Sequence, residues 1–179
     1  MFLTNGALFA NLLPRYPEIK SDLALSNTVF GLAVAAFSAG ALLTGPAAPT
    51  LIRRFRSSVV AVAGSALLAA FVLAAGLAPS GVLLAAALFC AGAADSVVDV
   101  AQNVHGLRVQ RHYGRFIINS LHAVWSMGAV LGGLMGAGAI YLHIPRAAQL
   151  SVSGVLLSVT CLASYRFLLP GHDHAARES

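Results

Sequence analysis

Charged residues are scarce in this sequence. Asp, Glu, Lys and Arg account for 9% of the 179 residues, whereas a soluble domain carries about 25%. Hydrophobic residues account for 58%, and the mean hydropathy is +0.81. A soluble core cannot enclose this much apolar surface, so lipid must be the solvent for most of the chain. The composition excludes an ordinary soluble domain and predicts an integral membrane protein.

Acidic residues are the scarcer of the two signs, with 6 Asp and Glu against 11 Lys and Arg, which gives a net charge of +5. A basic excess can indicate nucleic-acid binding. Here the basic residues lie between apolar runs and form no patch on a soluble domain, so we expect no nucleic-acid partner. The 2 cysteines, Cys90 and Cys161, fall inside apolar segments. This favours small core residues over a disulfide or a metal site.

Sequence motifs for catalysis are missing as well. We find no nucleophile–base set, no His or Cys cluster with metal-ligand spacing and no phosphate-binding loop. His172 and His174 belong to a polar tail, and the motif HDH is too short to define a metal site. The first residues lack the basic segment and cleavage site of a secretory signal peptide. We therefore predict that the protein is not an enzyme and has no cofactor or bound metal.

The long apolar runs predict an all-α, polytopic membrane helix bundle with six spans. The first run has only 13 residues before Pro14. At 1.5 Å per residue it covers about 20 Å, less than the roughly 30 Å of a bilayer core, so the first span is truncated. The bundle occupies residues 1–170, and residues 171–179 form a polar cytoplasmic tail. The predicted spans are 1–14, 27–51, 57–78, 82–104, 116–142 and 146–169.

The distribution of Lys and Arg predicts the orientation of the bundle. The positive-inside rule assigns the side with more of them to the cytoplasm. Both basic loops and both chain ends then lie in the cytoplasm, in agreement with an even number of spans. The cytoplasmic side carries Arg53, Arg54, Arg56, Arg108, Arg111, Arg115, Arg166 and Arg177, and the opposite side carries Arg15, Lys20 and Arg146.

A polar stripe interrupts the fourth span. Asp95 is followed at offsets of four, seven and eight by Asp99, Gln102 and Asn103, which places all four on one helix face. Two carboxylates on a lipid-compatible helix need a partner or a wet cavity. We predict that this stripe forms the polar wall of a passage. The alternative is a helix end at the aqueous interface, where carboxylates cost little.

The fifth span carries a second polar group, and the first span carries one polar residue. Offsets of three and four put Asn119, His122 and Ser126 on one face. Trp125 could instead be an interfacial anchor, His122 could make a helix–helix hydrogen bond, and Asn5 could belong to a small-residue contact. As candidate substrate-binding residues we name Asn5, Gln102, Asn103, Asn119, His122, Trp125 and Ser126.

Three stretches carry a family resemblance: NGALFANLLPRYPEIKSDLALSNTVFGLAVAAFSAGALL, DSVVDVAQNVHGLRVQRHYGR and NSLHAVWSMGAVLGG. With the six spans, they resemble the N-terminal half of a major facilitator superfamily transporter, of a bacterial sugar-permease-like or uncharacterised branch. The resemblance covers almost the whole chain. It implies an alternating-access secondary carrier of the bacterial plasma (inner) membrane, with its substrate between two six-helix halves. This chain would then be half of a carrier, a fragment, or a unit that pairs with another copy.

The loop after the second span departs from the family pattern. The family's signature runs Gly-x-Leu-Ala-Asp-Arg-x-Gly-Arg-Arg, where this chain has PTLIRRFRSS. Arg53 stands at the Asp and Arg56 at the second Gly, while Arg54 matches. An arginine cannot accept the hydrogen bonds of that Asp. We therefore carry over only the position and basic charge of this gating loop, formed by Arg53, Arg54 and Arg56.

We predict transport of a small solute without covalent chemistry. Asp95 or Asp99 would carry a proton, because a carboxyl group in low dielectric can bind one from one side of the membrane. The partners would be the solute, protons and the lipid bilayer, as in a proton symporter. A membrane packing or assembly module, or an inactive fragment, is the alternative, although such a module needs no pair of acids on one helix. The sequence leaves the solute and the direction of transport open.

Overall fold

The computed structural model of this chain describes residues 1–171, and every regular element in that range is a helix. The predicted all-α fold class is therefore confirmed. The predicted tail, with His172, His174 and Arg177, lies outside the described residues apart from Gly171. The α-helices are α1 Phe2–Ala10, α2 Tyr16–Asp22, α3 Asn27–Thr44, α4 Ala48–Phe55, α5 Ser57–Gly76, α6 Gly81–Tyr113, α7 Ile118–Tyr141 and α8 Arg146–Ser164.

Five helical stretches are long and apolar enough to cross a membrane. The first of them joins α3 and α4 into Asn27–Phe55 through a short 3-10 turn, and the other four are α5, α6, α7 and α8, the last extended to Phe167. Helix α1 is shorter, with 9 residues. Five long apolar helices with one short helix at the start of the chain agree with the predicted class of fold.

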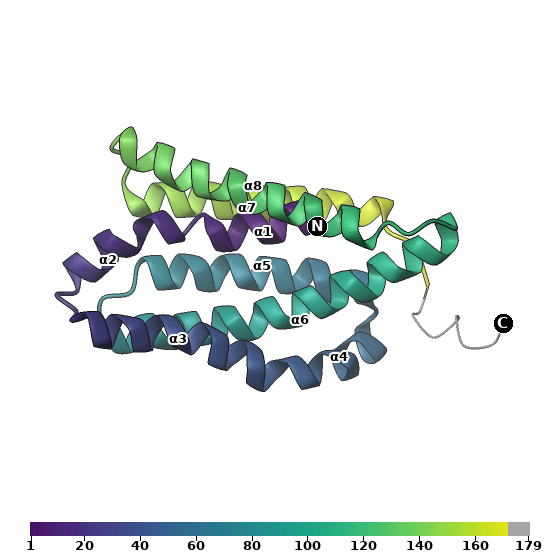
Figure 1. Cartoon of the computed structure of the whole chain (residues 1–179), viewed down its shortest axis with the longest axis horizontal. Helices are drawn as coiled ribbons and strands as arrows, with labels where there is room; N and C mark the ends of the chain where they lie inside the picture. The colour runs from purple at the N-terminus through teal and green to yellow at the C-terminus, as the bar shows by residue number, and fades with distance from the viewer. Residues whose placement is uncertain (172–179) are drawn as a thin grey trace.

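The helices form two groups with α5 between them (Figure 1). Helices α1, α7 and α8 lie along one side of the bundle, and α3, α4 and α6 lie along the other. Helix α5 contacts α6 on one side and α8 on the other. The largest apolar core joins both groups, since it includes Leu8 of α1, Leu68 of α5, Leu88 of α6 and Leu150 of α8, all of them buried.

Glycines bring α1 and α7 into direct backbone contact. A Cβ atom added to Gly128 or Gly132 would collide with the carbonyl oxygen of Leu3 or Ala7, respectively. A Cβ on Gly136 would lie 2.7 Å from the carbonyl oxygen of Asn11. These three glycines are spaced by four residues, as in two overlapping GxxxG patterns. They serve a contact within this chain, of the kind that small residues allow between membrane helices.

Helix α6 is longer than the predicted fourth span. Ser80 caps its start, because the Ser80 hydroxyl accepts a hydrogen bond from the Leu83 N–H at 3.3 Å. The helix continues to Tyr113 and ends at Gly114, whose φ of 69° is in the left-handed region that favours glycine. Arg108 and Arg111, predicted in a loop, thus lie on the last turns of α6, where cations interact favourably with the helix dipole.

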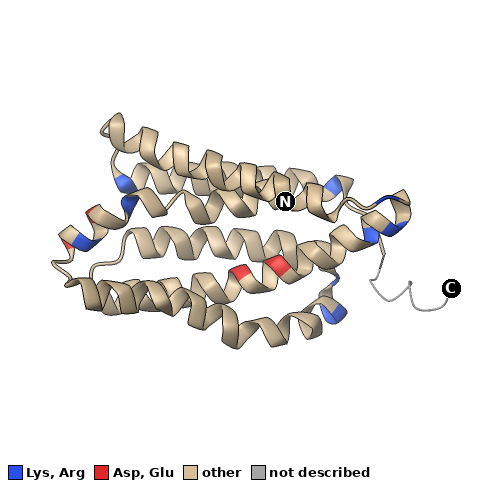
Figure 2. Cartoon of the chain, in the orientation of Figure 1, with Lys and Arg blue, Asp and Glu red and all other residues tan. Residues whose placement is uncertain are grey.

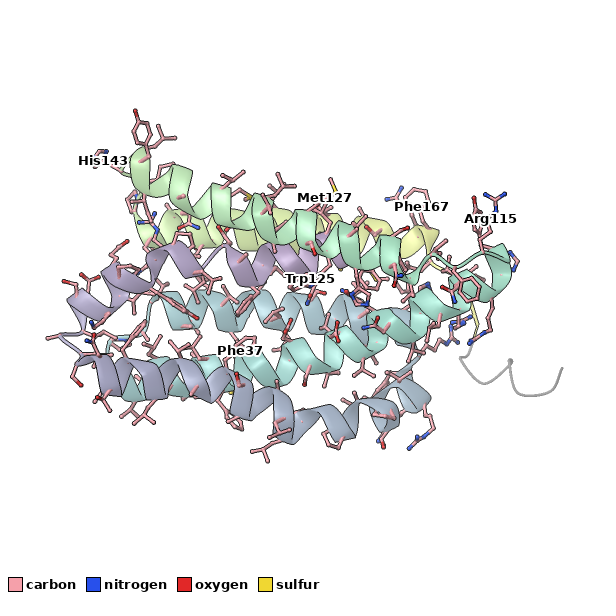
Figure 3. The ribbon with its side chains drawn as sticks, in the orientation of Figure 1. Phe37, Arg115, Trp125, Met127, His143 and Phe167 are labelled. Carbon is pink, nitrogen blue, oxygen red and sulfur yellow. The ribbon has the colours of Figure 1, made fainter. Side chains whose placement is uncertain are left out.

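The charged residues of the described chain gather at the two ends of the bundle, with one exception (Figure 2). One end carries the basic ends of α4, α6 and α8, and Arg115 lies there (Figure 3). The other end carries α2 and the start of α8, where both signs occur. The exception is α6, which bears Asp95 and Asp99 between these ends. The sidedness of these ends in a membrane remains a prediction.

Candidate functional site

A hydrogen-bonded chain of three side chains links α1, α6 and α7. The Asn5 amide nitrogen donates to Asp95 Oδ1 at 2.8 Å, and the Asn5 amide oxygen accepts from Trp125 Nε1 at 2.6 Å. Asn5 is 2% exposed, while Asp95 and Trp125 are half-buried. Figure 3 shows Trp125 near the start of α1, between the ribbons of α7 and α6. We call these three residues the Asn5 relay.

Local packing explains why the relay forms at this level. Gly6 sits so close to α7 that a Cβ atom there would collide with the Trp125 carbonyl oxygen. The adjacent Asn5 is thereby held within reach of the indole. An indole N–H can only donate, so it fixes which end of the Asn5 amide faces Trp125 and which faces Asp95. Both polar ends of the Asn5 side chain are engaged by protein.

A second polar group lies on the same side of α6 and α7. Asp99 is exposed, and the Asn103 amide nitrogen donates to its carboxylate at 3.2 Å and to its backbone carbonyl at 2.9 Å. His122 interacts electrostatically with Asp99. The edge of the His122 ring meets Phe2 with a centroid distance of 5.7 Å. The structure thus places two acids, one amide and one imidazole near one another.

The remaining candidates on α7 lie on its exposed surface. The Ser126 hydroxyl donates to the His122 carbonyl at 3.1 Å, and Asn119 lies in the first turn of the helix. Neither side chain is buried. The polar face, as we name this surface from here on, comprises Asn5, Asp95, Asp99, Asn103, Asn119, His122, Trp125 and Ser126.

Gln102 departs from the sequence prediction. It lies two turns from Asp95, but its side chain is fully buried instead of facing a passage. Together with His105, Phe2, Leu121 and Phe167 it lines a separate cavity of about 340 Å³. Both atoms of its amide lack a hydrogen-bond partner among the described residues. The offset of seven residues places Gln102 near the helix face of Asp95, but residues of α1, of α7 and of the segment that follows α8 surround its side chain.

Sequence reasoning missed a buried polar network at the opposite end of the bundle. Arg15, which is 4% exposed, donates from Nε to Gln149 at 2.8 Å, from Nη1 to Glu18 at 2.7 Å and from Nη2 to the Ile144 carbonyl at 2.7 Å. Glu18 also pairs with Arg146 at 3.1 Å. A charged side chain predicted in a surface loop is thus an internal tie between α2 and α8.

The same network reaches the end of α1. The Gln149 amide nitrogen donates to Asn11 Oδ1 at 2.6 Å, and Asn11 also bonds to Ser153. All three side chains are buried. Gln149 and Ser153 are spaced by four residues on α8, so the sequence places them on one helix face.

The predicted gating loop is exposed at the basic end of the bundle. Arg53 donates to the Thr50 hydroxyl at 3.0 Å, and the Arg54 guanidinium lies 5.2 Å from the centre of the Phe55 ring. Arg56 has φ 71° and ψ 146° between α4 and α5. This backbone conformation is essentially restricted to glycine. The arginine that replaces the second glycine of the signature therefore keeps a glycine-like backbone.

These observations define a helical bundle with several apolar spans and a partly exposed polar face formed by α1, α6 and α7. Among residues 1–171 no group of three or more His, Cys, Asp or Glu side chains is placed to hold a metal ion. A family model described as Major Facilitator Superfamily matches residues 1–179. The chain belongs to the major facilitator superfamily. This is a family of transporters rather than of enzymes.

Two curated relatives are themselves bacterial transporters of uncharacterised function. The chain is 32% identical over 183 aligned residues to the uncharacterized transporter y4wD of Sinorhizobium fredii. This alignment covers 98% of this chain and 48% of the relative. The chain is 25% identical over 170 residues to an uncharacterized MFS-type transporter of Yersinia pestis. That alignment covers 95% of this chain and 44% of the relative. The chain spans about half the length of these relatives.

Proposed function

We propose that this six-helix unit is half of a proton-coupled secondary carrier that moves a small polar solute by alternating access. The observation that carries the proposal is the polar face. It brings Asp95 and Asp99 together with hydrogen-bonding side chains from α1 and α7, midway along a largely apolar bundle. Charged residues within membrane spans are costly and typically belong to substrate or proton pathways. A bundle that served only to pack helices would not need them.

Asp95 and Asp99 are the proton-coupling residues in this proposal. They lie one helical turn apart, and two carboxylates at that spacing repel each other. A proton bound to either carboxylate removes this repulsion without any change in the fold. The described helices α3, α5, α7 and α8 contain no Asp or Glu, so none of them offers an alternative carboxyl group for this role.

The solute would bind beside the two acids. Asn103, His122 and Ser126 offer hydrogen-bond donors and acceptors, and the half-buried ring of Trp125 offers a stacking surface. The exposed Asn119 lies one turn before His122 and would extend this surface. Asn5 instead positions Asp95 and Trp125, because both polar ends of its side chain are already engaged. Gln102 lies outside this binding surface.

The passage requires a second wall, which we assign to a second six-helix half or to another copy of this chain. The carrier would lie in the bacterial inner membrane. Its basic end, with the loop formed by Arg53, Arg54 and Arg56, and both chain ends would face the cytoplasm. Coupling to a proton moving in the same direction as the solute would make it a symporter.

Proton movement driven by solute gradients tests this function. The chain, alone and co-reconstituted with a second six-helix half from a relative, is placed in vesicles that contain a pH-sensitive dye. Sugars and organic cations are then added in turn. We expect one class to drive proton movement, and we expect Asp95→Asn or Asp99→Asn to abolish it. The matched control is Asp22→Asn, since Asp22 lies at the mixed-charge end of the bundle.

Two outcomes would contradict the proposal. Transport with unchanged pH dependence in both Asp95→Asn and Asp99→Asn would remove the acids from proton coupling. Stable association of the two halves without movement of any solute would favour the packing or assembly role.

A further inference from the structure

The Asn5 relay joins the two groups of helices. Helix α1 is tied to α7 by direct backbone contact at Gly6 and Gly132. Helix α6 packs mainly on α3 and α5. The hydrogen bond from Asn5 to Asp95 therefore links the α1–α7 pair to α6, and the bond from Trp125 to Asn5 extends that link to the indole.

The orientation of the Asn5 amide leaves it no alternative arrangement. Rotation of the amide by half a turn would bring its NH₂ group toward the indole N–H and its oxygen toward the Asp95 carboxylate. Both contacts would then be repulsive, since donor would face donor and acceptor would face acceptor. A change in the Asn5–Asp95 bond that displaces the amide therefore also changes its contact to Trp125.

We propose that Asn5 is a positioning residue that transmits proton binding at Asp95 to the Trp125 ring. The proposal deepens the proposed proton coupling and rests on it. With Asp95 ionised, the bond from Asn5 is charge-assisted and holds α6 against α1. Hydrogen bonds to an ionised group are roughly twice as strong as those between neutral groups. A proton on the other carboxyl oxygen leaves a neutral, weaker bond, so the tie between the helix groups loosens.

Few other charged groups face Asp95. Asp99 is one turn away on α6, and His122 of α7 interacts with Asp99. The Met1 amino group lies at the start of α1, while Phe2–Ala10, α3 and α5 contain no charged side chain. A pH-dependent change in the surroundings of Trp125 could therefore come from three sources, which the experiment must separate. They are Asp95, the Asp99–His122 pair and the amino group of Met1.

Tryptophan fluorescence can read this relay directly, because Trp125 is the only tryptophan in the sequence. The purified chain in detergent micelles is titrated from acidic to alkaline pH while its emission is recorded. We expect the emission maximum to shift in one sigmoidal step. Infrared spectroscopy of the protonated carboxyl band, assigned by its loss in Asp95→Asn, should give the same midpoint.

Variants separate the relay from its surroundings. Asp95→Asn should abolish the emission step. Asn5→Ala should also abolish it while the infrared band of Asp95 still titrates. The matched control is Asn103→Ala, which removes an amide bonded to Asp99 only, and His122→Ala tests the imidazole. Both should keep the step. If Asn5→Ala does not fold, Asn5→Ser replaces it, since a serine hydroxyl is too short to reach both partners.

The outcomes distinguish this inference from the proposed function. An emission step that persists in Asn5→Ala, or Asp95 protonation without an emission step, would overturn the relay and leave proton coupling standing. If Asp95 showed no protonation at any pH tested, both the relay and the assignment of Asp95 to proton coupling would fail.

Discussion

Arg15 shows how a single charged residue can be accommodated inside this bundle. Its guanidinium has three different partners: the Gln149 amide oxygen, the Glu18 carboxylate and the Ile144 carbonyl. Burial of a charge is tolerated when it is paired and its remaining hydrogen-bonding groups are satisfied. The geometry of the network, rather than the ion pair alone, makes this position stable.

We predict that Arg15→Met destabilises the protein. Removal of one partner from a buried ion pair costs about 3–5 kcal/mol. Because the Glu18 side chain is 40% exposed, we expect a loss in free energy of unfolding near the lower limit, about 3 kcal/mol. Denaturant unfolding in detergent measures it. The control Arg53→Met, at an exposed arginine, should change stability by less than about 0.5 kcal/mol, and equal effects of the two variants would contradict the prediction.

We predict that Arg56→Gly stabilises the protein. Arg56 has φ 71° and ψ 146°, a conformation that costs about 1–3 kcal/mol for a residue other than glycine. Glycine adopts it without that strain, so the midpoint of thermal unfolding should rise. Arg56→Ala is the control, because alanine keeps the Cβ atom and the strain. A rise with alanine as large as that with glycine would assign the effect to loss of charge instead.

At the scale of elements, the contact between α1 and α7 depends on which glycines face inward. Gly132 faces the Ala7 backbone, whereas an added Cβ atom on the adjacent Gly133 would have no neighbour within 4 Å. Two glycines in sequence therefore have different roles. One permits close approach, and the other only lowers helix propensity.

We predict opposite effects for Gly132→Ala and Gly133→Ala. The first forces backbone atoms apart and should cost about 1–3 kcal/mol, as overpacking does. The second should add about 0.5–1 kcal/mol, since alanine is the better residue in a helix interior. Thermal unfolding of both variants under the same conditions compares them directly. The same sign in both would show that α7 does not depend on this contact.

The sequence predicts those features of the fold that depend on residues close together in the chain. Composition and apolar runs predict the helical bundle, and helix periodicity places Asp95 and Asp99 on one face. The sequence names Asn5, Asp95 and Trp125 as candidates, but it does not predict the hydrogen bonds of the Asn5 relay, because they join residues 90 and 120 positions apart. Helix offsets tell which residues share a face but not what covers it, so they do not predict that Gln102 is buried. The apolar run predicts a span that ends near residue 104, yet nothing breaks the helix before Gly114.

At the scale of the whole molecule, the basic end and the mixed-charge end predict the orientation in the membrane. In a variant without Cys90 and Cys161, single cysteines are introduced at Lys20 and at Arg111. We expect an impermeant thiol reagent to label Lys20→Cys in cells with a permeable outer membrane. Arg111→Cys should react only after the inner membrane is opened. The reverse labelling pattern would show that the bundle has the opposite orientation in the membrane.

The spacing of the contact between α1 and α7 restricts how these helices can move. On α7 the facing glycines recur every four residues. The opposing carbonyls of Leu3 and Ala7 on α1 and of Asn11, directly after it, recur at the same interval. A displacement by part of a turn would push side chains of one helix into the backbone of the other. The two helices can therefore slide past each other only in steps of about one helical turn, about 5.4 Å. Motion small enough to preserve the bundle must carry α1 and α7 together as one rigid body.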